Sequence, residues 1–248
     1  MWKRIKRAFT PEAPPARKKQ GRGRIPRHYD APGAAVIRRV RPRTMTSHEK
    51  LYGFILATRY VVDHSIEGAI VECGVWRGGS MQAAALTLAE RGDTNRELHL
   101  FDTFEGMPPP GEQDRRIDGQ SAESLLATHD RSHNVWAIAT LDDVKQAMAE
   151  VDYPAERVHF HKGLVEDTIP AAAPEKIAIL RLDTDWYEST RHELEHLYDR
   201  LEPGGVLIID DYGHWEGSRQ ATEEFLAKTG APLLLLPMAS GRIAVKPR

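Results

Sequence analysis

Residues 70–80 read Ile-Val-Glu-Cys-Gly-Val-Trp-Arg-Gly-Gly-Ser, and an alanine-rich run joins them to Leu-His-Leu-Phe-Asp at 98–102. An apolar run, a glycine turn, a helix-forming segment and a second apolar run ending in an acid predict strand, loop, helix and strand in that order. We interpret this stretch as the opening βαβ unit of a Rossmann-like sheet.

The spacing of the glycines indicates which nucleoside this turn binds. An acid, Glu72, stands two residues before Gly74, and the next glycines come only at 78 and 79, so the run departs from the dinucleotide pattern G-x-G-x-x-G. A carboxylate there would repel a pyrophosphate, whereas it suits the amino group of a methionine-like tail. The turn therefore resembles the first motif of S-adenosylmethionine methyltransferases, with Ser80 opening the helix and Asp102 placed to bind a ribose. A purely structural glycine turn in another α/β domain is the alternative.

Composition agrees with a single α/β domain after a basic leader. The chain has 248 residues, 41% of them hydrophobic, which is enough for a core without crosslinks. Its one cysteine, Cys73, lies in the first expected strand, so we interpret it as a core residue in a reducing compartment. No apolar run reaches the roughly 18 residues of a membrane span, and no signal peptide is visible. We expect a soluble, cytoplasmic protein.

Residues 1–43 differ from the rest in charge, with fourteen Lys or Arg against two acids, Glu12 and Asp30. This proline-rich segment has too little apolar content to fold alone. We expect an arm that is disordered or packed on a neighbouring subunit, followed by a catalytic domain over 44–248. An arm that binds nucleic acid is less favoured, because the segment lacks interleaved aromatic residues.

The remaining pattern alternates helices and strands. Thr46 or Ser47 can cap a helix, and the loop 103–119 follows a strand end, where it is a candidate lid over a binding crevice. Further strands are expected at 157–161, 176–182 and 206–209, with helices at 121–128, 141–150, 188–200 and 219–228. Residues 233–236 and 243–246 predict a C-terminal hairpin.

Acids follow two neighbouring buried strands. Asp183 and Asp185 end one, and Asp210 and Asp211 end the next. Carboxylates that converge at one edge of a sheet cannot all be ionised without a neutralising cation, and hard oxygen ligands select Mg²⁺, Ca²⁺ or Mn²⁺. Helix capping is the alternative, and it explains one such acid better than four.

Four runs of this sequence resemble those of a known family. The runs Val71–Ser80, Phe101–Met107, Leu180–Thr190 and Pro203–Gly213 look like the macrocin O-methyltransferase (TylF/MycF) family, in order and with similar spacing over roughly residues 45–228. These enzymes use S-adenosylmethionine and Mg²⁺ to methylate sugar hydroxyls of antibiotics. The resemblance implies the class I methyltransferase fold, a mostly parallel seven-stranded sheet flanked by helices with a C-terminal antiparallel hairpin.

The resemblance also implies roles for individual residues. Asp183, Asp210 and Asp211 match the metal triad. The cofactor-binding set that it implies is Met45, Thr46, Glu72, Gly74, Ser80, Asp102, Gly163, Val165, Glu166 and Asp183. Glu72 and Gly74 would line the methionine end, Met45 and Thr46 would close over the cofactor, and the turn 163–166 would lie beside the adenine.

Catechol O-methyltransferase, a more distant relative, has a lysine base shortly after its first acid, where this chain has Trp186. We therefore expect a carboxylate base, Asp183, with Asp185 or His214 as alternatives. The acceptor would be a glycosylated or sugar-nucleotide small molecule bound by a homo-oligomer, a dimer or tetramer, with neither nucleic acid nor membrane as a partner.

Two other functions remain open. A catechol-type phenol methyltransferase would need an aromatic slot, which Trp186, Tyr187, Tyr212 and Trp215 could form. A non-catalytic binding protein with a vestigial fold would have no reason to keep the acids expected to bind the cofactor together with the acids expected to bind the metal.

Overall fold

The computed structural model describes residues 24–248, and these residues form one seven-stranded sheet in the order β3-β2-β1-β4-β5-β7-β6. Strands β1 to β5 pair in parallel, and β7 pairs antiparallel with both β5 and β6. The strands are β1 (Ala69–Cys73), β2 (Leu98–Asp102), β3 (Val158–Lys162), β4 (Ile177–Leu182), β5 (Leu201–Ile209), β6 (Leu236–Met238) and β7 (Gly241–Val245). The predicted parallel sheet and its C-terminal hairpin are confirmed, with the hairpin strands shifted by a few residues.

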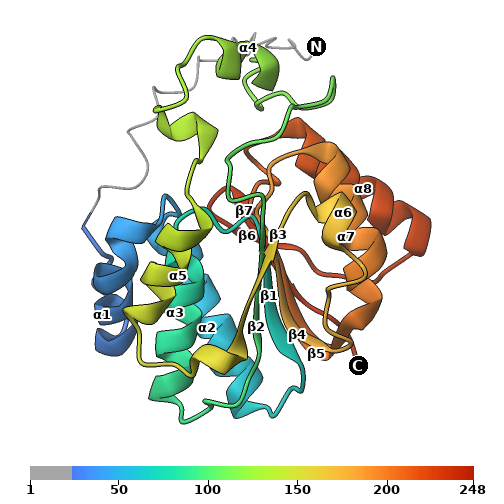
Figure 1. Cartoon of the computed structure of the whole chain (residues 1–248). Helices are drawn as coiled ribbons and strands as arrows, with labels where there is room; N and C mark the ends of the chain where they lie inside the picture. The colour runs from blue at the N-terminus through green and yellow to red at the C-terminus, as the bar shows by residue number, and fades with distance from the viewer. Residues whose placement is uncertain (1–23) are drawn as a thin grey trace, which may run out of the picture.

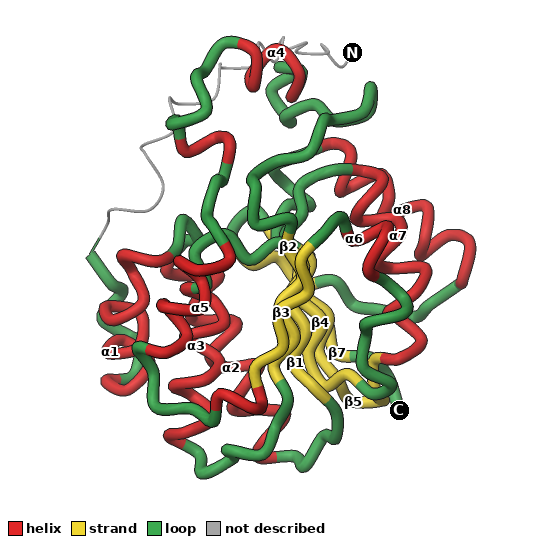
Figure 2. Tube along the Cα trace, in the orientation of Figure 1, coloured by secondary structure: helices red, strands yellow, loops and turns green. Residues whose placement is uncertain are grey.

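Helices cover both faces of the sheet (Figure 1). One layer holds α1 (Ala31–Val40), α2 (His48–Asp63), α3 (Gly79–Glu90) and α5 (Leu141–Ala149), and the other holds α6 (Val165–Thr168), α7 (Tyr187–Leu197) and α8 (Glu216–Thr229). The short helix α4 (Ala122–Ala127) stands apart, beyond the end of the sheet at which β1, β2 and β4 finish, and long loops surround it in Figure 2. In the described part of the chain, short 3-10 helices lie at Arg41–Arg43, Asn134–Trp136, Ala155–Arg157 and Tyr198–Arg200. No helix among residues 24–248 is long and apolar enough to cross a membrane.

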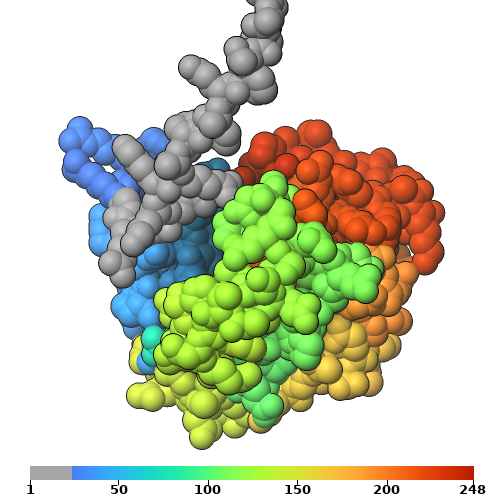
Figure 3. Space-filling model, turned by 90° about the horizontal axis from the view of Figure 1, so that it is seen from above, coloured from blue at the N-terminus to red at the C-terminus, as the bar shows by residue number. Residues whose placement is uncertain are grey.

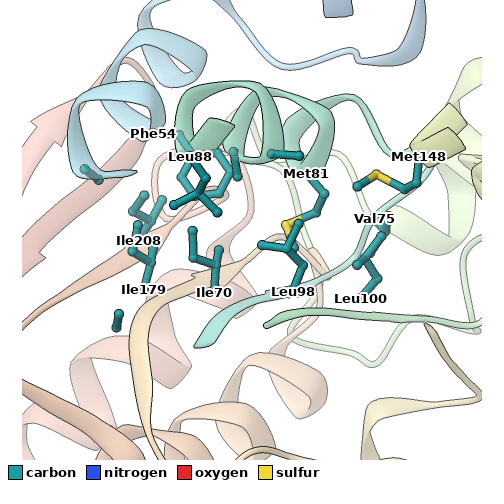
Figure 4. Packing of buried hydrophobic residues seen from close by; sticks show 14 of the residues in the cluster. Phe54, Ile70, Val75, Met81, Leu88, Leu98, Leu100, Met148, Ile179 and Ile208 are labelled. Carbon is teal, nitrogen blue, oxygen red and sulfur yellow. The ribbon is translucent and has the colours of Figure 1, made fainter. Parts of the chain in front are cut away.

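The core has one part on each face of the sheet. Between the sheet and α2 and α3, Ile70, Ile179 and Ile208 pack against Phe54 and Leu88, all of them at most 1% exposed (Figure 4). Phe101, Leu180 and Leu207 face the other way, toward α7 and α8. Burial on both faces explains why these strands are continuous apolar runs.

Side-chain caps fix where the helices begin. Ser47 Oγ, one of the two predicted caps, accepts a hydrogen bond from the backbone N–H of Lys50, and Thr140 Oγ1 accepts one from the backbone N–H of Asp143. The helix α3 begins one residue earlier than expected, after Gly78, whose φ of +80° is a conformation that glycine adopts without strain.

We expected residues 1–43 to be an arm that is disordered or packed on a neighbouring subunit, but part of this segment folds against its own chain. Asp30 caps α1 by accepting a hydrogen bond from the Gly33 N–H, and Ile37 and Val40 are fully buried against Leu51 and other residues of α2 and α3. One stripe of apolar residues, spaced three residues apart, lets this short helix pack in spite of Arg38 and Arg39. The rest of the expected arm, residues 1–23, lies outside the described residues.

Candidate active site

A cavity of about 430 Å³ opens at the carboxyl end of the parallel strands. That end is where a doubly wound sheet binds its ligands. Eight residues of the predicted cofactor-binding set line the cavity. Asp210 and Asp211 of the expected metal triad line it as well. Those eight are Met45, Thr46, Gly74, Asp102, Gly163, Val165, Glu166 and Asp183.

Gly74 lets two loops approach each other at the floor of the cavity. It has a φ of +82°, and a Cβ there would lie 2.1 Å from the carbonyl oxygen of Asp183. A side chain at 74 would therefore push the β1 and β4 ends apart. The glycine turn and the first acidic strand end form one unit.

Asp102 ends β2 and reaches across to the glycine turn. Its Oδ2 accepts hydrogen bonds from the backbone N–H groups of Val75 (2.7 Å) and Trp76 (3.0 Å), and its Oδ1 accepts one from Phe104 (2.7 Å). Burial raises its pKa above the usual range, while these donors oppose that rise. Oδ1 accepts only one backbone bond, and its second, longer bond comes from the Thr103 hydroxyl at 3.4 Å, which a ligand hydroxyl can replace.

The strand-end acids converge as predicted. Asp183, Asp210 and Asp211 each offer an oxygen, and these atoms lie within 4.8 Å of one another. Asp185 also lines the cavity, and its Oδ1 accepts a hydrogen bond from Trp215 Nε1 at 2.6 Å. His214 lines the same cavity.

Two buried cations, which the sequence analysis did not single out, hold this cluster. Arg181, 1% exposed, pairs with Glu72, with Asp183 Oδ2 at 2.8 Å and with Asp210 Oδ1 at 2.6 Å. Lys50 of α2 pairs with the other oxygen of Asp210. Both oxygens of Asp210 therefore already contact a cation.

Arg181 carried a signal in the sequence, because it is the only charge within an otherwise apolar buried strand. In the register of β1 and β4, Glu72 lies opposite Arg181, so the pair is built into the sheet. Lys50, in the first turn of an ordinary amphipathic helix, carried no comparable signal.

Glu72 and Ser80 differ from the expectation that they line the cofactor site. Glu72 is 0% exposed and Ser80 is 4% exposed, and neither is among the described residues that line the cavity. Glu72 lies beneath the floor, where its second oxygen, Oε2, has no hydrogen-bond partner among residues 24–248. Burial raises the pKa of Glu72 to about 7, although Arg181 opposes the rise.

Negative charge exceeds positive charge in this cluster. Five acids (Glu72, Asp183, Asp185, Asp210 and Asp211) face two cations (Lys50 and Arg181). Burial, together with the neighbouring carboxylates, raises the pKa of Asp183 and Asp211 well above the usual range. Asp210 is the exception, since Lys50 and Arg181 hold its pKa low against the effect of burial.

Asp211 Oδ2 is buried without a partner among the described residues. An orphaned carboxylate oxygen in a cluster with excess negative charge fits a hard divalent cation. The residues present therefore suit Mg²⁺, with Asp183 and Asp211 more available to it than Asp210.

The segment 103–139 lies across the face of the molecule seen in Figure 3, and part of it lines the cavity. Thr103, Gly106, Met107 and Pro108 line it, which places the candidate lid over the crevice. The segment is fastened to the acidic strand ends, because Trp186 Nε1 donates to the Pro108 carbonyl (3.0 Å) and the Tyr187 N–H donates to Asp114 Oδ1 (2.8 Å). The rings of Trp186 and Trp215 meet edge to face at 4.9 Å beneath α4.

The sequence that builds this site matches a known protein family. Residues 19–235 match the family described as macrocin-O-methyltransferase (TylF), so the match includes α1. The chain is 34% identical over 187 residues to the 8-demethyl-8-(2,3-dimethoxy-alpha-L-rhamnosyl)-tetracenomycin-C 4'-O-methyltransferase of Streptomyces olivaceus, covering 75% of this chain and 69% of that protein. It is 32% identical to the demethyldecarbamoylnovobiocin O-methyltransferase of Streptomyces niveus, covering 75% and 68%.

Solved structures of methyltransferases are similar to this chain in fold. The O-methyltransferase NovP superposes with a TM-score of 0.73 at 30% identity, covering 83% of each chain. The calicheamicin methyltransferase CalS11 has the same fold, with a TM-score of 0.61 at 20% identity, covering 88% of this chain and 94% of that one.

Proposed function

Because the chain belongs to the macrocin O-methyltransferase family, we propose that it transfers the methyl group of S-adenosylmethionine to a sugar hydroxyl, in a Mg²⁺-dependent reaction of antibiotic biosynthesis. The acceptor would be a glycosylated natural product or a nucleotide-linked sugar. One observation carries the proposal: a single cavity brings the glycine turn at Gly74 together with three carboxylates within 4.8 Å of one another.

The residues on one side of the cavity would bind the cofactor, which supplies an electrophilic sulfonium methyl. Asp102 Oδ1 would accept a hydrogen bond from a ribose hydroxyl, and the turn 163–166 would contact the base. Met45 and Thr46 would cover the methionine end from the start of α2. Thr46 is already oriented there, since its Oγ1 accepts a hydrogen bond from Arg181 Nη2 at 3.2 Å.

The residues on the other side would bind Mg²⁺, which lowers the pKa of a coordinated hydroxyl. Asp183 and Asp211 would be its main protein ligands, with Asp210 as the third. Arg181 and Lys50 would keep Asp210 ionised and fix its orientation.

Asp183 is our proposed general base, because it lines the cavity and lies among the metal-binding carboxylates. Asp185 is the alternative that the geometry favours next. It lines the same cavity, and burial next to Asp183 raises its pKa to about 7, which suits a base at neutral pH.

A catechol-type acceptor is less well supported than a sugar. The four aromatic residues that could have formed a slot for it, Trp186, Tyr187, Tyr212 and Trp215, are not among the described residues that line the cavity. Trp186 and Trp215 are instead buried under α4. Two other aromatic residues, Trp76 and Phe101, do line the cavity, but the carboxylates of Asp183, Asp185 and Asp211 lie there too and suit hydroxyl groups.

The test combines calorimetry with product analysis. S-adenosylmethionine should bind with or without Mg²⁺, whereas methylation of a panel of sugar nucleotides and glycosides should stop in EDTA and return with Mg²⁺. Asp211→Asn should need more Mg²⁺ for turnover, and Asp199→Asn, outside the cavity, should behave as the wild type. Full turnover in excess chelator would refute the metal, and methylation of catechols but of no glycoside in the panel would refute the acceptor.

A further inference from the structure

A second group of possible metal ligands lies on the edge of the sheet, away from the cavity. Glu97 immediately precedes β2, His99 lies on β2, and His159 and His161 lie on the edge strand β3. None of these four is among the described residues that line the cavity. The proposed function makes no use of them.

The parallel register brings these side chains together. His99 lies opposite His159, and side chains two residues apart on a strand share a face, so Glu97 and His161 lie on the same side. The ring centroids of His99 and His159 are 4.7 Å apart, and those of His99 and His161 are 5.2 Å apart. One ligand atom each from Glu97, His99 and His159 lies within 4.8 Å of the others.

The hydrogen bonds within the group leave ligand atoms available. His99 Nδ1 lies 3.0 Å from His161 Nε2, so a proton on Nδ1 leaves His99 Nε2 with a free lone pair. Glu97 uses Oε1 for Arg157 and Oε2 for His159 Nε2. A cation between Glu97 and His159 would replace that second contact and leave the first intact.

His99 and His161 are the more enclosed imidazoles of the group, and burial favours their neutral form. Burial lowers the pKa of His99 to about 4, and it lowers that of His161, with the other histidines adding to both effects. Neutral imidazole is the form that binds a metal. His159 and Glu97 are 39% and 34% exposed at their side chains, so an ion can reach the group from solvent.

We propose that Glu97, His99 and His159 bind a borderline divalent transition ion such as Zn²⁺, and that His161 orients His99 for it. Two imidazoles and a carboxylate favour Zn²⁺ over Mg²⁺, whereas the all-oxygen aspartate cluster favours Mg²⁺. The ion joins the edge strand β3 to β2, whose ends contribute Gly163 and Asp102 to the cavity. Its role is to clamp the sheet edge.

The experiment measures Zn²⁺ bound to the full-length protein at equilibrium in excess Mg²⁺, by metal analysis and competition with a chromophoric chelator. Wild type should hold one equivalent, and Zn²⁺ should raise its midpoint of thermal unfolding. His159→Ala and Glu97→Gln should each weaken Zn²⁺ at least about tenfold and lose the thermal shift. His161→Ala should weaken Zn²⁺ by a smaller factor.

The matched control is His196→Ala, because His192 and His196 are one turn apart on α7 with ring centroids 4.3 Å apart and form another histidine pair outside the proposed site. It should bind Zn²⁺ as the wild type does. The proposal is overturned if the wild type takes up no Zn²⁺, if His159→Ala and Glu97→Gln both bind it unchanged, or if His196→Ala abolishes binding. Glu97→Gln preserves size, so it remains informative even if His159→Ala unfolds.

Discussion

Replacing Arg181 by methionine tests whether the acidic cluster depends on its buried guanidinium. Methionine keeps an unbranched apolar stem but removes the charge from a side chain that is 2% exposed. Glu72 and Asp183 then lose their cation, and Asp210 keeps only Lys50. Removing one partner from a buried ion pair typically costs about 3–5 kcal/mol, because the other charge stays buried without compensation.

The loss should depend on pH in a defined direction. The pKa of Glu72 is already about 7 with Arg181 present, so without it the folded variant retains protons that the unfolded chain releases above about pH 4.5. Where the folded state binds more protons than the unfolded state, stability falls as pH rises. The destabilisation of Arg181→Met should therefore be larger at pH 8 than at pH 6.

Urea unfolding in EDTA, followed by tryptophan fluorescence, measures the free energy of unfolding at both pH values. The control is Arg191→Met on α7, whose 41% exposed side chain pairs with Glu188 and Glu195 and should contribute less than about 1 kcal/mol. A loss for Arg181→Met no larger than that of the control, or equal losses at pH 6 and pH 8, would refute the reasoning.

Three further outcomes are expected. Asp102→Ala leaves ribose hydroxyls unpaired and should weaken S-adenosylmethionine by about 1–3 kcal/mol in calorimetry, and unchanged affinity would remove Asp102 from the cofactor site. Asp211→Asn should regain turnover in excess Mg²⁺, because this change damages only the occupancy of the ion. Asp183→Asn should stay about 10²–10⁴-fold slower than the wild type at saturating Mg²⁺ if Asp183 is the base. Full rescue of Asp183→Asn by Mg²⁺ would transfer the role of base to Asp185 or His214. Asp30→Ala removes the α1 cap and should cost about 1 kcal/mol at pH 7. Arg59 and the cap lower the pKa of Asp30, so its contribution is present above about pH 4 and is lost as pH falls further; a wild-type advantage that persists undiminished at pH 2 would contradict this assignment.

The fold could be predicted because each of its signals is local. The apolar runs of β1, β4 and β5 end at glycines or acids, and parallel strands bring those ends to one edge. The convergence of Asp183, Asp210 and Asp211 then follows from topology alone.

What could not be predicted depends on contacts between distant segments. Lys50 reaches Asp210 across 160 residues, and nothing near Lys50 in the sequence marks that contact. Glu72 has the residue type of a cofactor contact, but its register opposite Arg181 pairs it with a buried cation, and this pairing was not predicted. The helix α1 was not predicted, because arginines dominate the composition of residues 1–43. Its sequence does carry a helix signal, since Asp30 can cap it and Ile37 and Val40 are spaced to lie on one face.

Segment 103–139 is hydrogen-bonded to Trp186 and Tyr187, so the cavity is built from two different kinds of wall. The acids lie on the ends of buried strands, where any change disturbs the core, whereas the outer wall is a loop attached at a few points. Beyond Asp114 the segment is also tied to the turn after Asp211, because the Ile117 N–H donates to the His214 carbonyl and the Glu216 N–H donates to the Arg115 carbonyl. A change in this segment would therefore act on the cavity wall and on the turns after Asp185 and Asp211 together.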